Sequence, residues 1–436
     1  MKGGFNLNKI IRNFFIIILI IAFLIAFSSS YLSLGIDNLA YVLAIGIDKG
    51  SDNNLQVSFQ FSTTSKTTES GASEKTPTVI DSVEAPSLST AFNLMNSYMG
   101  KELNLSHCKV IIFAEDFAYT GISEEIYTLI NNSQVRPSAN IVVSKCNAKY
   151  YMEQTSPELE NLLSKYYEIF TNSSKYSGFK PDATIGDFFN SLICKTCEPV
   201  AILGGISTEK PENQGNNHIQ ENYNVKANQT PIEGENGSEN IGIAAFKDDI
   251  LIGELCALET TCYLALRNKV DRFLISIADP DDTSSYIDIY ITPASSTNIT
   301  IDTSTNSPYI KVKTSFNGRI HSMTNDSKYL DPEVLDNISK TCNKYLESVF
   351  GDYLYKTAKD FKSDINGFGK YALNNFFTTQ DFDTYNWCDN YQNAFFDVEV
   401  NTSVKSRHVN YRNLRMSPLF PDFFGDGNTE RRNYFV

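Results

Sequence analysis

The sequence predicts an α+β protein with two to three domains, and three observations lead to this fold class. The chain is 436 residues long, and at roughly one domain per 150 residues this length allows two or three folded units. Strand-like and helix-like patterns are mixed along the whole chain, as in α+β or mixed α/β proteins. Residues 207–240 are polar and rich in Asn, Glu, Gln and Gly from residue 212 onward, which predicts a flexible loop or linker between two globular regions.

The charge balance limits the classes of partner. Thirty-seven Lys and Arg residues against 51 Asp and Glu residues give a formal net charge of -14, whereas binding to a nucleic-acid backbone requires a basic surface. We therefore predict no nucleic-acid partner. The chain has only four histidines, which argues against a His-rich metal centre, and no cofactor is predicted.

The N-terminus carries an apolar segment with membrane-targeting character. Residues 14–27 are uninterruptedly apolar, follow three basic residues and precede three serines. A cleaved secretory signal has this order, but a retained anchor is favoured because the apolar character continues to Ile36, near the roughly 20 residues that cross a bilayer. The positive-inside rule then places the basic end in the cytoplasm and the rest of the chain outside. The predicted anchor residues are Phe14, Ile18, Ile21, Leu24 and Phe27.

Eight cysteines are spread through the chain, and their number alone does not define a pairing. Cys194 and Cys197 have the spacing used by zinc ribbons and redox sites, but no second pair or nearby histidine completes a set of four ligands. Structural thiols are the favoured interpretation. A local Cys194–Cys197 disulfide and metal or redox chemistry are the alternatives.

The first region, residues 37–206, predicts a mixture of strands and helices. Residues 55–61 alternate apolar and polar side chains, which predicts a half-buried antiparallel strand. A helix that begins at Pro86 carries an apolar stripe formed by Leu88, Ala91, Phe92, Met95 and Tyr98. Further strands are predicted at 40–47, 110–114 and 141–143, further helices at 124–130, 159–170 and 185–192, and a polar loop at 63–76.

The second region, residues 241–412, begins with a predicted hairpin. Residues 243–246 and 250–255 form its strands, and Lys247-Asp248-Asp249 forms its turn. A long helix follows Pro332 and carries an apolar stripe that includes Ile338 and Leu346. The region also contains a predicted helix at 257–267 and predicted strands at 272–278, 286–292, 298–303, 309–317 and 394–405. Residues 413–436 form a tail without a periodic pattern.

Common motifs of catalytic sites are missing from the sequence. There is no G-x-S-x-G, H-E-x-x-H, Walker A or G-x-G-x-x-G pattern. His107 directly precedes a cysteine, but neighbours in a strand point to opposite faces, so packing or hydrogen bonding is favoured over catalysis. Asp279, Asp281 and Asp282 could hold calcium only with added carbonyl ligands, and a solvated turn is favoured.

Several local signatures occur in the order found in one protein family. In the first region these are residues 44–49 (AIGIDK), 105–111 (LSHCKVI), 184–188 (TIGDF) and 203–205 (LGG). In the second region, residues 245–253 (AFKDDILIG) resemble the family's "avFkddkLvG" hairpin, and residues 364–369 followed by Trp387 resemble its C-terminal element. The chain thus resembles the Ger(x)C family, the C subunits of bacterial spore germinant receptors.

The resemblance implies a non-enzymatic subunit of a nutrient receptor in the spore inner membrane. It implies several mixed α/β domains in an extended arrangement on the extracytoplasmic face. The implied partners are the membrane and two membrane subunits, A and B, with small-molecule recognition attributed mainly to B. Family members are typically lipoproteins with a cysteine after the apolar run, but the first cysteine here is Cys108, which favours an uncleaved anchor over residues 1–36. The alternative is a membrane-anchored extracytoplasmic module that binds a small ligand or a cell-wall component.

Ten residues match the family's pattern and are expected to be fold determinants. Glycines at turns and a capping aspartate would account for several of them. They are Gly46, Asp48, His107, Lys109, Gly204, Phe246, Asp248, Gly253, Asp364 and Gly369.

Overall fold

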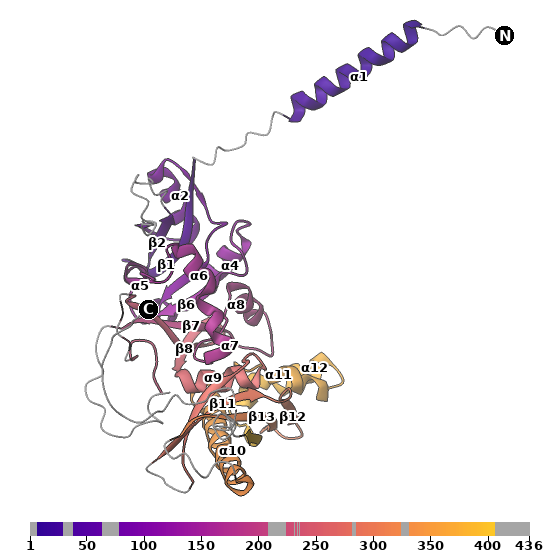
Figure 1. The fold of residues 1–436 in the computed structure, drawn as a ribbon. Coiled ribbons are helices and arrows are strands. Elements are labelled where there is room, and N and C mark those ends of the chain that lie inside the picture. Colours follow the sequence, from indigo (N-terminus) through magenta and orange to yellow (C-terminus); the bar gives the residue numbers. More distant parts are fainter. Residues whose placement is uncertain are drawn as a thin grey trace, which may run out of the picture.

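The computed structural model describes residues 7–28, 38–62, 78–207, 224–230, 232, 234, 236–280, 285–323 and 331–405. Apart from the N-terminal helix α1 (Leu7–Ser28), most of these residues form two domains, each built on one β-sheet. Figure 1 shows the first domain above the second, with α9 (Ala257–Leu266) at the boundary between them.

The first domain contains a mixed nine-stranded sheet in the order β3-β2-β1-β5-β6-β7-β8-β9, with β4 paired to β1. The central strands β1, β5, β6 and β7 run parallel, and antiparallel strands extend the sheet on both sides. Parallel strands are buried on both faces, which explains the continuous apolar run of β5. The first seven strands of this sheet are β1 (Leu39–Lys49), β2 (Leu55–Ser62), β3 (Thr78–Ala85), β4 (Glu102–Asn104), β5 (Val110–Ala114), β6 (Asn140–Ser144) and β7 (Val200–Ile206), and the last two, β8 and β9, are described below.

Seven α-helices of the described chain belong to this domain, and α2 shows how the sequence sets their limits. The Ser87 hydroxyl accepts a hydrogen bond from the backbone N–H of Thr90 at its start, and Gly100 ends it in the left-handed conformation. The predicted stripe is wrong at Tyr98, which is exposed, because Met99 continues the packed face four residues after Met95. The helices are α2 (Leu88–Met99), α3 (Glu115–Ala118), α4 (Ser123–Asn131), α5 (Ala148–Gln154), α6 (Leu163–Ile169), α7 (Ser174–Ser177) and α8 (Ile185–Leu192).

Strand β2 is more deeply buried than its alternating pattern predicts. Its polar residues Ser58 and Gln60 are 0% and 1% exposed. Ser58 Oγ lies 2.8 Å from Ser82 Oγ, and the Tyr167 hydroxyl donates a hydrogen bond to Gln60 Oε1 at 2.9 Å. The half-buried prediction is therefore wrong, because these partners satisfy the polar side chains inside the domain. The antiparallel pairing of this strand is confirmed.

The hairpin formed by β8 (Ser238–Lys247) and β9 (Ile250–Leu255) connects the two domains. Both strands pair into the first sheet, so this sheet extends beyond the expected boundary at residue 240. Ala244 and Phe246 belong to the hydrophobic core of the first domain, whereas Ile243 and Ala245 belong to that of the second. Because successive side chains point to opposite faces of a strand, β8 contributes to both cores.

Residues 224–230, within the segment predicted as a flexible joint, instead pack against the first domain. Ala227 is fully buried, and its backbone N–H donates to the Ile241 carbonyl at 3.1 Å. The Asn228 side-chain oxygen accepts a hydrogen bond from the Ile206 N–H at 2.6 Å. The polar side chains that suggested flexibility here provide hydrogen-bond acceptors for the backbone of a neighbouring strand.

The second domain is a five-stranded sheet in the order β10-β11-β13-β12, with β14 parallel to β13. The long helix α10 (Pro332–Tyr355), capped by Asp331, packs against β14 and β10 and continues as a π-helix to Phe361. The strands are β10 (Phe273–Ala278), β11 (Tyr286–Pro293), β12 (Asn298–Asp302), β13 (Tyr309–Met323) and β14 (Phe395–Lys405), and the remaining α-helices are α11 (Gly369–Ala372), α12 (Thr379–Tyr385) and α13 (Trp387–Tyr391).

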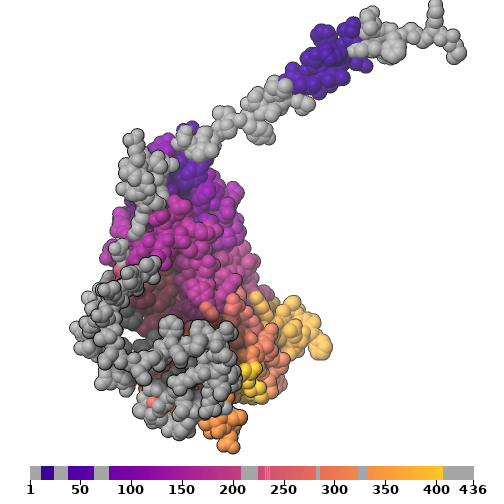
Figure 2. Space-filling model, viewed as in Figure 1, coloured from indigo at the N-terminus to yellow at the C-terminus, as the bar shows by residue number. Residues whose placement is uncertain are grey.

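Helix α1 stands apart from both domains, as the ribbon and the space-filling view show (Figures 1 and 2). Three predicted anchor residues, Phe14, Ile18 and Ile21, are 62%, 45% and 50% exposed. Leu24 and Phe27 lie in the helix, but their side chains are outside the described part. No helix among the described residues combines the length and apolarity needed to cross a membrane.

Three other predictions fall outside the described residues: the loop at 63–76, the tail at 413–436, and the two aspartates at 281 and 282. Asp279, the described member of the acidic loop, is 5% exposed rather than solvated. Its backbone N–H donates to the Ser285 carbonyl at 2.9 Å.

A buried carboxylate fixes α5 on the first sheet. Asp48, at the end of β1, is 3% exposed and accepts hydrogen bonds from the backbone N–H groups of Ala148 at 2.6 Å and Lys149 at 3.2 Å. These groups belong to the first turn of α5, so Asp48 caps a helix that lies a hundred residues later in the chain. Burial raises the pKa of Asp48, and the two backbone N–H groups partly offset this effect.

We expect Asp48→Ala to lower the free energy of unfolding by about 1–2 kcal/mol, because the α5 N–H groups lose their acceptor. Asp48→Asn keeps one acceptor oxygen but turns its amide N–H₂ toward the second N–H donor, so it should lose at least half of that amount. Urea unfolding monitored by circular dichroism measures both, with the exposed Asp182→Ala as the matched control. Losses no larger than that of the control would contradict a capping role.

Candidate functional site

The ten signature residues do not form one cavity, but most of them fall into two clusters. The first cluster surrounds α5 and contains Gly46, Asp48 and Gly204. A Cβ atom at Gly204 would lie 2.7 Å from Val142 Cγ1 and 3.1 Å from the Tyr151 ring, so the close approach of these side chains requires glycine. Gly46 and Gly204 lie within strands β1 and β7, so close packing rather than a turn accounts for them.

His107 and Lys109 lie outside both clusters. His107 is exposed and packs edge-on against the Tyr41 ring, with 5.1 Å between centroids. His107 lies in a turn, so the prediction that it and Cys108 point to opposite faces of a strand is wrong. The two side chains still have different environments, because Cys108 is buried. Lys109 Nζ pairs with the Glu168 carboxylate at 3.3 Å.

The second cluster lies where the β8–β9 hairpin meets the second domain. Phe246 is fully buried and contacts Phe188 edge-to-face at 4.9 Å, while its carbonyl accepts a hydrogen bond from the Ser363 hydroxyl at 2.7 Å. Asp248 occupies the hairpin turn with a left-handed φ of 53°. Its backbone N–H donates to the Glu198 carboxylate at 2.7 Å. The end of β8 is thus hydrogen-bonded to Ser363 of the second domain and to Glu198 of the first.

Asp364 organises the second-domain side of this junction. It is 3% exposed and accepts hydrogen bonds from the N–H of Phe368 at 3.0 Å, the N–H of Gly369 at 2.8 Å and the indole N–H of Trp387 at 2.9 Å. Burial raises its pKa to about 6, although the hydrogen bonds favour the charged form. One carboxylate therefore fixes the start of α11 and the orientation of α13.

Two signature glycines allow close packing at the same junction. A Cβ atom at Gly253 in β9 would lie 2.4 Å from the Phe361 ring. A Cβ atom at Gly369 would lie 2.9 Å from the Trp387 indole and 2.9 Å from Thr196 Cβ. Any larger residue would push the hairpin away from the π-helix that follows α10, or α11 away from the segment that precedes β7.

Glu198 is a buried acid that sequence patterns did not single out. It precedes Pro199 and β7, is 8% exposed, and accepts the Asp248 N–H described above. Burial raises its pKa to about 7, and the nearby Asp248 and Asp364 carboxylates add to this increase. Its function depends on a neighbour from a hairpin fifty residues away, so no local motif could have identified it.

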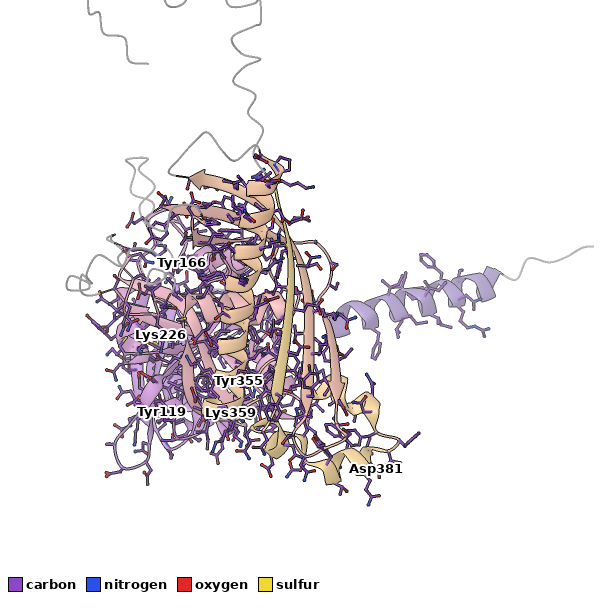
Figure 3. The ribbon with its side chains drawn as sticks, turned by 90° about the horizontal axis from the view of Figure 1, so that it is seen from below. Tyr119, Tyr166, Lys226, Tyr355, Lys359 and Asp381 are labelled. Carbon is purple, nitrogen blue, oxygen red and sulfur yellow. A yellow bond between two sulfur atoms is a disulfide. The ribbon has the colours of Figure 1, made fainter. Side chains whose placement is uncertain are left out.

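Ion pairs connect the hairpin to elements on both sides. Glu254 in β9 pairs with Lys145 at 2.6 Å and with Lys226 at 3.5 Å, while Lys356 pairs with Glu259 at 2.7 Å and donates to the Glu254 carbonyl at 3.2 Å. In Figure 3 the labelled Lys226 lies over the first-domain ribbon, while α10 runs through the centre of the view. Partly buried pairs of this kind are costly to break, because the remaining charge stays desolvated.

Cys194 and Cys197 form a disulfide, which is one of the two alternatives to the favoured free thiols. Thr196, between them, is buried and contacts the position of Gly369. Cys388 of α13 donates to the Lys195 carbonyl with 3.8 Å between the atoms. Among the described residues, no group of three or more His, Cys, Asp or Glu side chains is arranged to hold a metal ion.

Both halves of the chain match models of spore germination proteins. Residues 34–204 match the spore germination protein N-terminal domain, and residues 241–407 match the spore germination B3/GerAC-like C-terminal domain. These two matches define a two-domain spore germination protein. The chain belongs to the GerAC-like family, the C subunits of spore germinant receptors.

Individual relatives agree with this family. The chain is 24% identical to spore germination protein KC of Bacillus subtilis (strain 168) over 339 residues, which cover 76% of this chain and 80% of the relative. It is 24% identical over 189 residues to the putative spore germination protein YfkR of the same organism, covering 42% and 48% of the two chains. The crystal structure of the GerBC protein shares the fold with a TM-score of 0.50 and 13% identity, covering 83% of this chain and 96% of GerBC.

We expect Asp364→Asn to lower the free energy of unfolding by about 2–3 kcal/mol, because an amide offers one acceptor oxygen to a site with three N–H donors. The N–H₂ group of the new asparagine would also point at one of these N–H donors, with which it cannot form a hydrogen bond. Thermal unfolding of the purified chain measures the effect, and the exposed Asp360→Asn is the control. A loss no larger than that of the control would show that Asp364 does not hold the junction.

Glu198 predicts a specific dependence of stability on pH. Its folded pKa is near 7 and its usual value is 4.5, so the folded state binds this proton more tightly than the unfolded state. The resulting stabilisation is complete below about pH 4.5 and is lost as the pH rises through about 7, with an upper limit of about 3 kcal/mol. Glu198→Gln should flatten this part of the stability profile. The exposed Glu124→Gln should leave the profile unchanged, and an unaltered slope in the Glu198 variant would contradict the prediction.

Proposed function

We propose that this chain is a non-enzymatic C subunit of a spore nutrient germinant receptor that acts through contacts with the A and B membrane subunits. The observation that carries the proposal is the match of both family models, which follow one another over residues 34–204 and 241–407. Buried contacts of the β8–β9 hairpin with both domains hold the two domains in one arrangement, as expected for a subunit that acts by binding other subunits. In this proposal the signature residues maintain the fold and the junction.

Membrane attachment through the N-terminal apolar segment is part of the proposal. The described side chains of α1 that were predicted to contact lipid are exposed and have no protein surface to cover them. Such a row of exposed apolar side chains is costly in water and stable in a bilayer. By the positive-inside rule, the basic residues before it support an extracytoplasmic position for the two domains, at the spore inner membrane.

The proposal predicts that deleting the gene abolishes nutrient-triggered germination in the spore-former that encodes it. Complementation with the full chain should restore germination, and the A and B subunits should co-purify with it. A chain lacking residues 7–28 should leave the membrane fraction and fail to complement. The matched control replaces residues 7–28 with an unrelated apolar helix of the same length, which should restore both properties.

Normal germination in a clean deletion without a duplicate gene would refute the receptor role. Full membrane retention of the chain without residues 7–28, in the absence of A and B, would refute the anchor while leaving the receptor role intact.

A further inference from the structure

A cavity opens in the first domain away from the junction. Its volume is about 480 Å³, which lies within the range of small-molecule sites. Residues from the end of α7, from the segment that follows it, and from the start of β8 line the cavity. Those used below are Phe179, Lys180, Asn236, Glu239 and Asn240.

Lys180 is the distinctive group in this cavity. No described carboxylate lies within 4.0 Å of its ammonium group, and no hydrogen-bond acceptor among the described residues contacts it. The ammonium lies over the Phe170 ring, 5.3 Å from its centroid. Lys180 is half-buried, and this desolvation lowers its pKa to about 8. An unpaired cation in such surroundings lowers stability unless an anion joins it.

The backbone that carries Lys180 is fixed at the two preceding residues. The Thr261 hydroxyl of α9 donates to the Gly178 carbonyl at 3.0 Å, and the Gly242 N–H of β8 donates to the Phe179 carbonyl at 2.8 Å. Gly178 has a left-handed φ of 75°, and a Cβ atom there would lie 2.9 Å from the Thr261 hydroxyl. The lysine is therefore presented to the cavity by a rigid segment rather than by a free loop.

The two asparagine side chains of the cavity have protein partners. The Asn236 amide donates to the Ser238 carbonyl at 3.0 Å and to the Tyr166 hydroxyl at 3.4 Å; Tyr166 is labelled in Figure 3. The Asn240 oxygen accepts from the Tyr151 hydroxyl at 2.8 Å. Two acids, Glu158 and Glu239, also line the cavity, and neither carboxylate lies within 4.0 Å of the Lys180 ammonium group. The Glu239 oxygens are buried and have no hydrogen-bond partner among the described residues, and burial raises the pKa of this acid, which reduces its charge.

We propose that this cavity binds a small organic anion whose acid group pairs with the Lys180 ammonium. The body of the ligand would lie against Phe179 and the polar wall around Asn236 and Asn240. The size of the cavity, the unpaired cation and the fixed backbone carry this inference. It does not depend on the receptor role proposed above.

The test uses the full-length chain in detergent micelles, with two probes that carry the two common acid groups. Gluconate supplies a carboxylate with hydroxyls, and inorganic phosphate supplies the phosphate oxygens without an organic body. Sodium chloride at matched ionic strength is the reference, and calorimetric titration and the shift in Tm are the readouts. Lys180→Met removes the charge and nearly keeps the length, and Lys175→Met on exposed α7 is the matched control.

We expect at least one probe to bind and raise the Tm of the wild-type chain and of Lys175→Met. Lys180→Met should weaken this binding about tenfold or more, as expected for loss of a charged hydrogen bond, without lowering the Tm of the unliganded chain. A response to phosphate alone would support the site and restrict its ligands to phosphoryl compounds.

Two results would overturn the inference. The first is the absence of any response beyond that to sodium chloride. The second is a lower unliganded Tm in Lys180→Met that Glu158→Gln with Glu239→Gln reproduces, because an acid of the cavity wall would then be the partner of the lysine.

Discussion

The β8–β9 hairpin is the constraint on which the arrangement of the two domains depends. Its backbone is hydrogen-bonded into the first sheet, so its position is set by β7. Its side chains alternate between the two cores, with Ala244 and Phe246 on one face and Ile243 and Ala245 on the other. A shift of one residue in register would exchange these faces and disrupt both cores at once. The two domains therefore share β8 as part of both hydrophobic cores and are not simply joined by a linker.

Buried aspartates perform the same task in both domains. Asp48 caps α5 on the first sheet, and Asp364 binds the start of α11 together with the Trp387 indole. In each case burial disfavours the charge while backbone N–H groups favour it. Such carboxylates are costly unless all their partners are in place, and they therefore favour one arrangement of the surrounding helices over alternatives.

The lysines of the first domain show how different the environment of Lys180 is. Lys109, Lys145 and Lys226 all pair with glutamates, and these pairs either cover the sheet or connect it to the hairpin. Lys180 contacts an aromatic ring and a cavity instead. The rigid junction and the cavity beside α7 lie in different parts of this domain, so the two proposals, subunit contacts and binding of a small anion, are compatible with each other.

The sequence by itself determined the mixed α and β character and most of the elements, because these follow from local periodicity and turn chemistry, and its ordered motifs indicated the family by resemblance. The 243–255 hairpin and the helix after Pro332 could be placed from the pattern alone. Only the tertiary structure decided that β2 is buried on its polar face, that the hairpin belongs to the first sheet, and that Glu198 and Lys180 have unusual environments. Burial and pairing of these groups depend on partners tens to hundreds of residues away, and no local pattern contains that information.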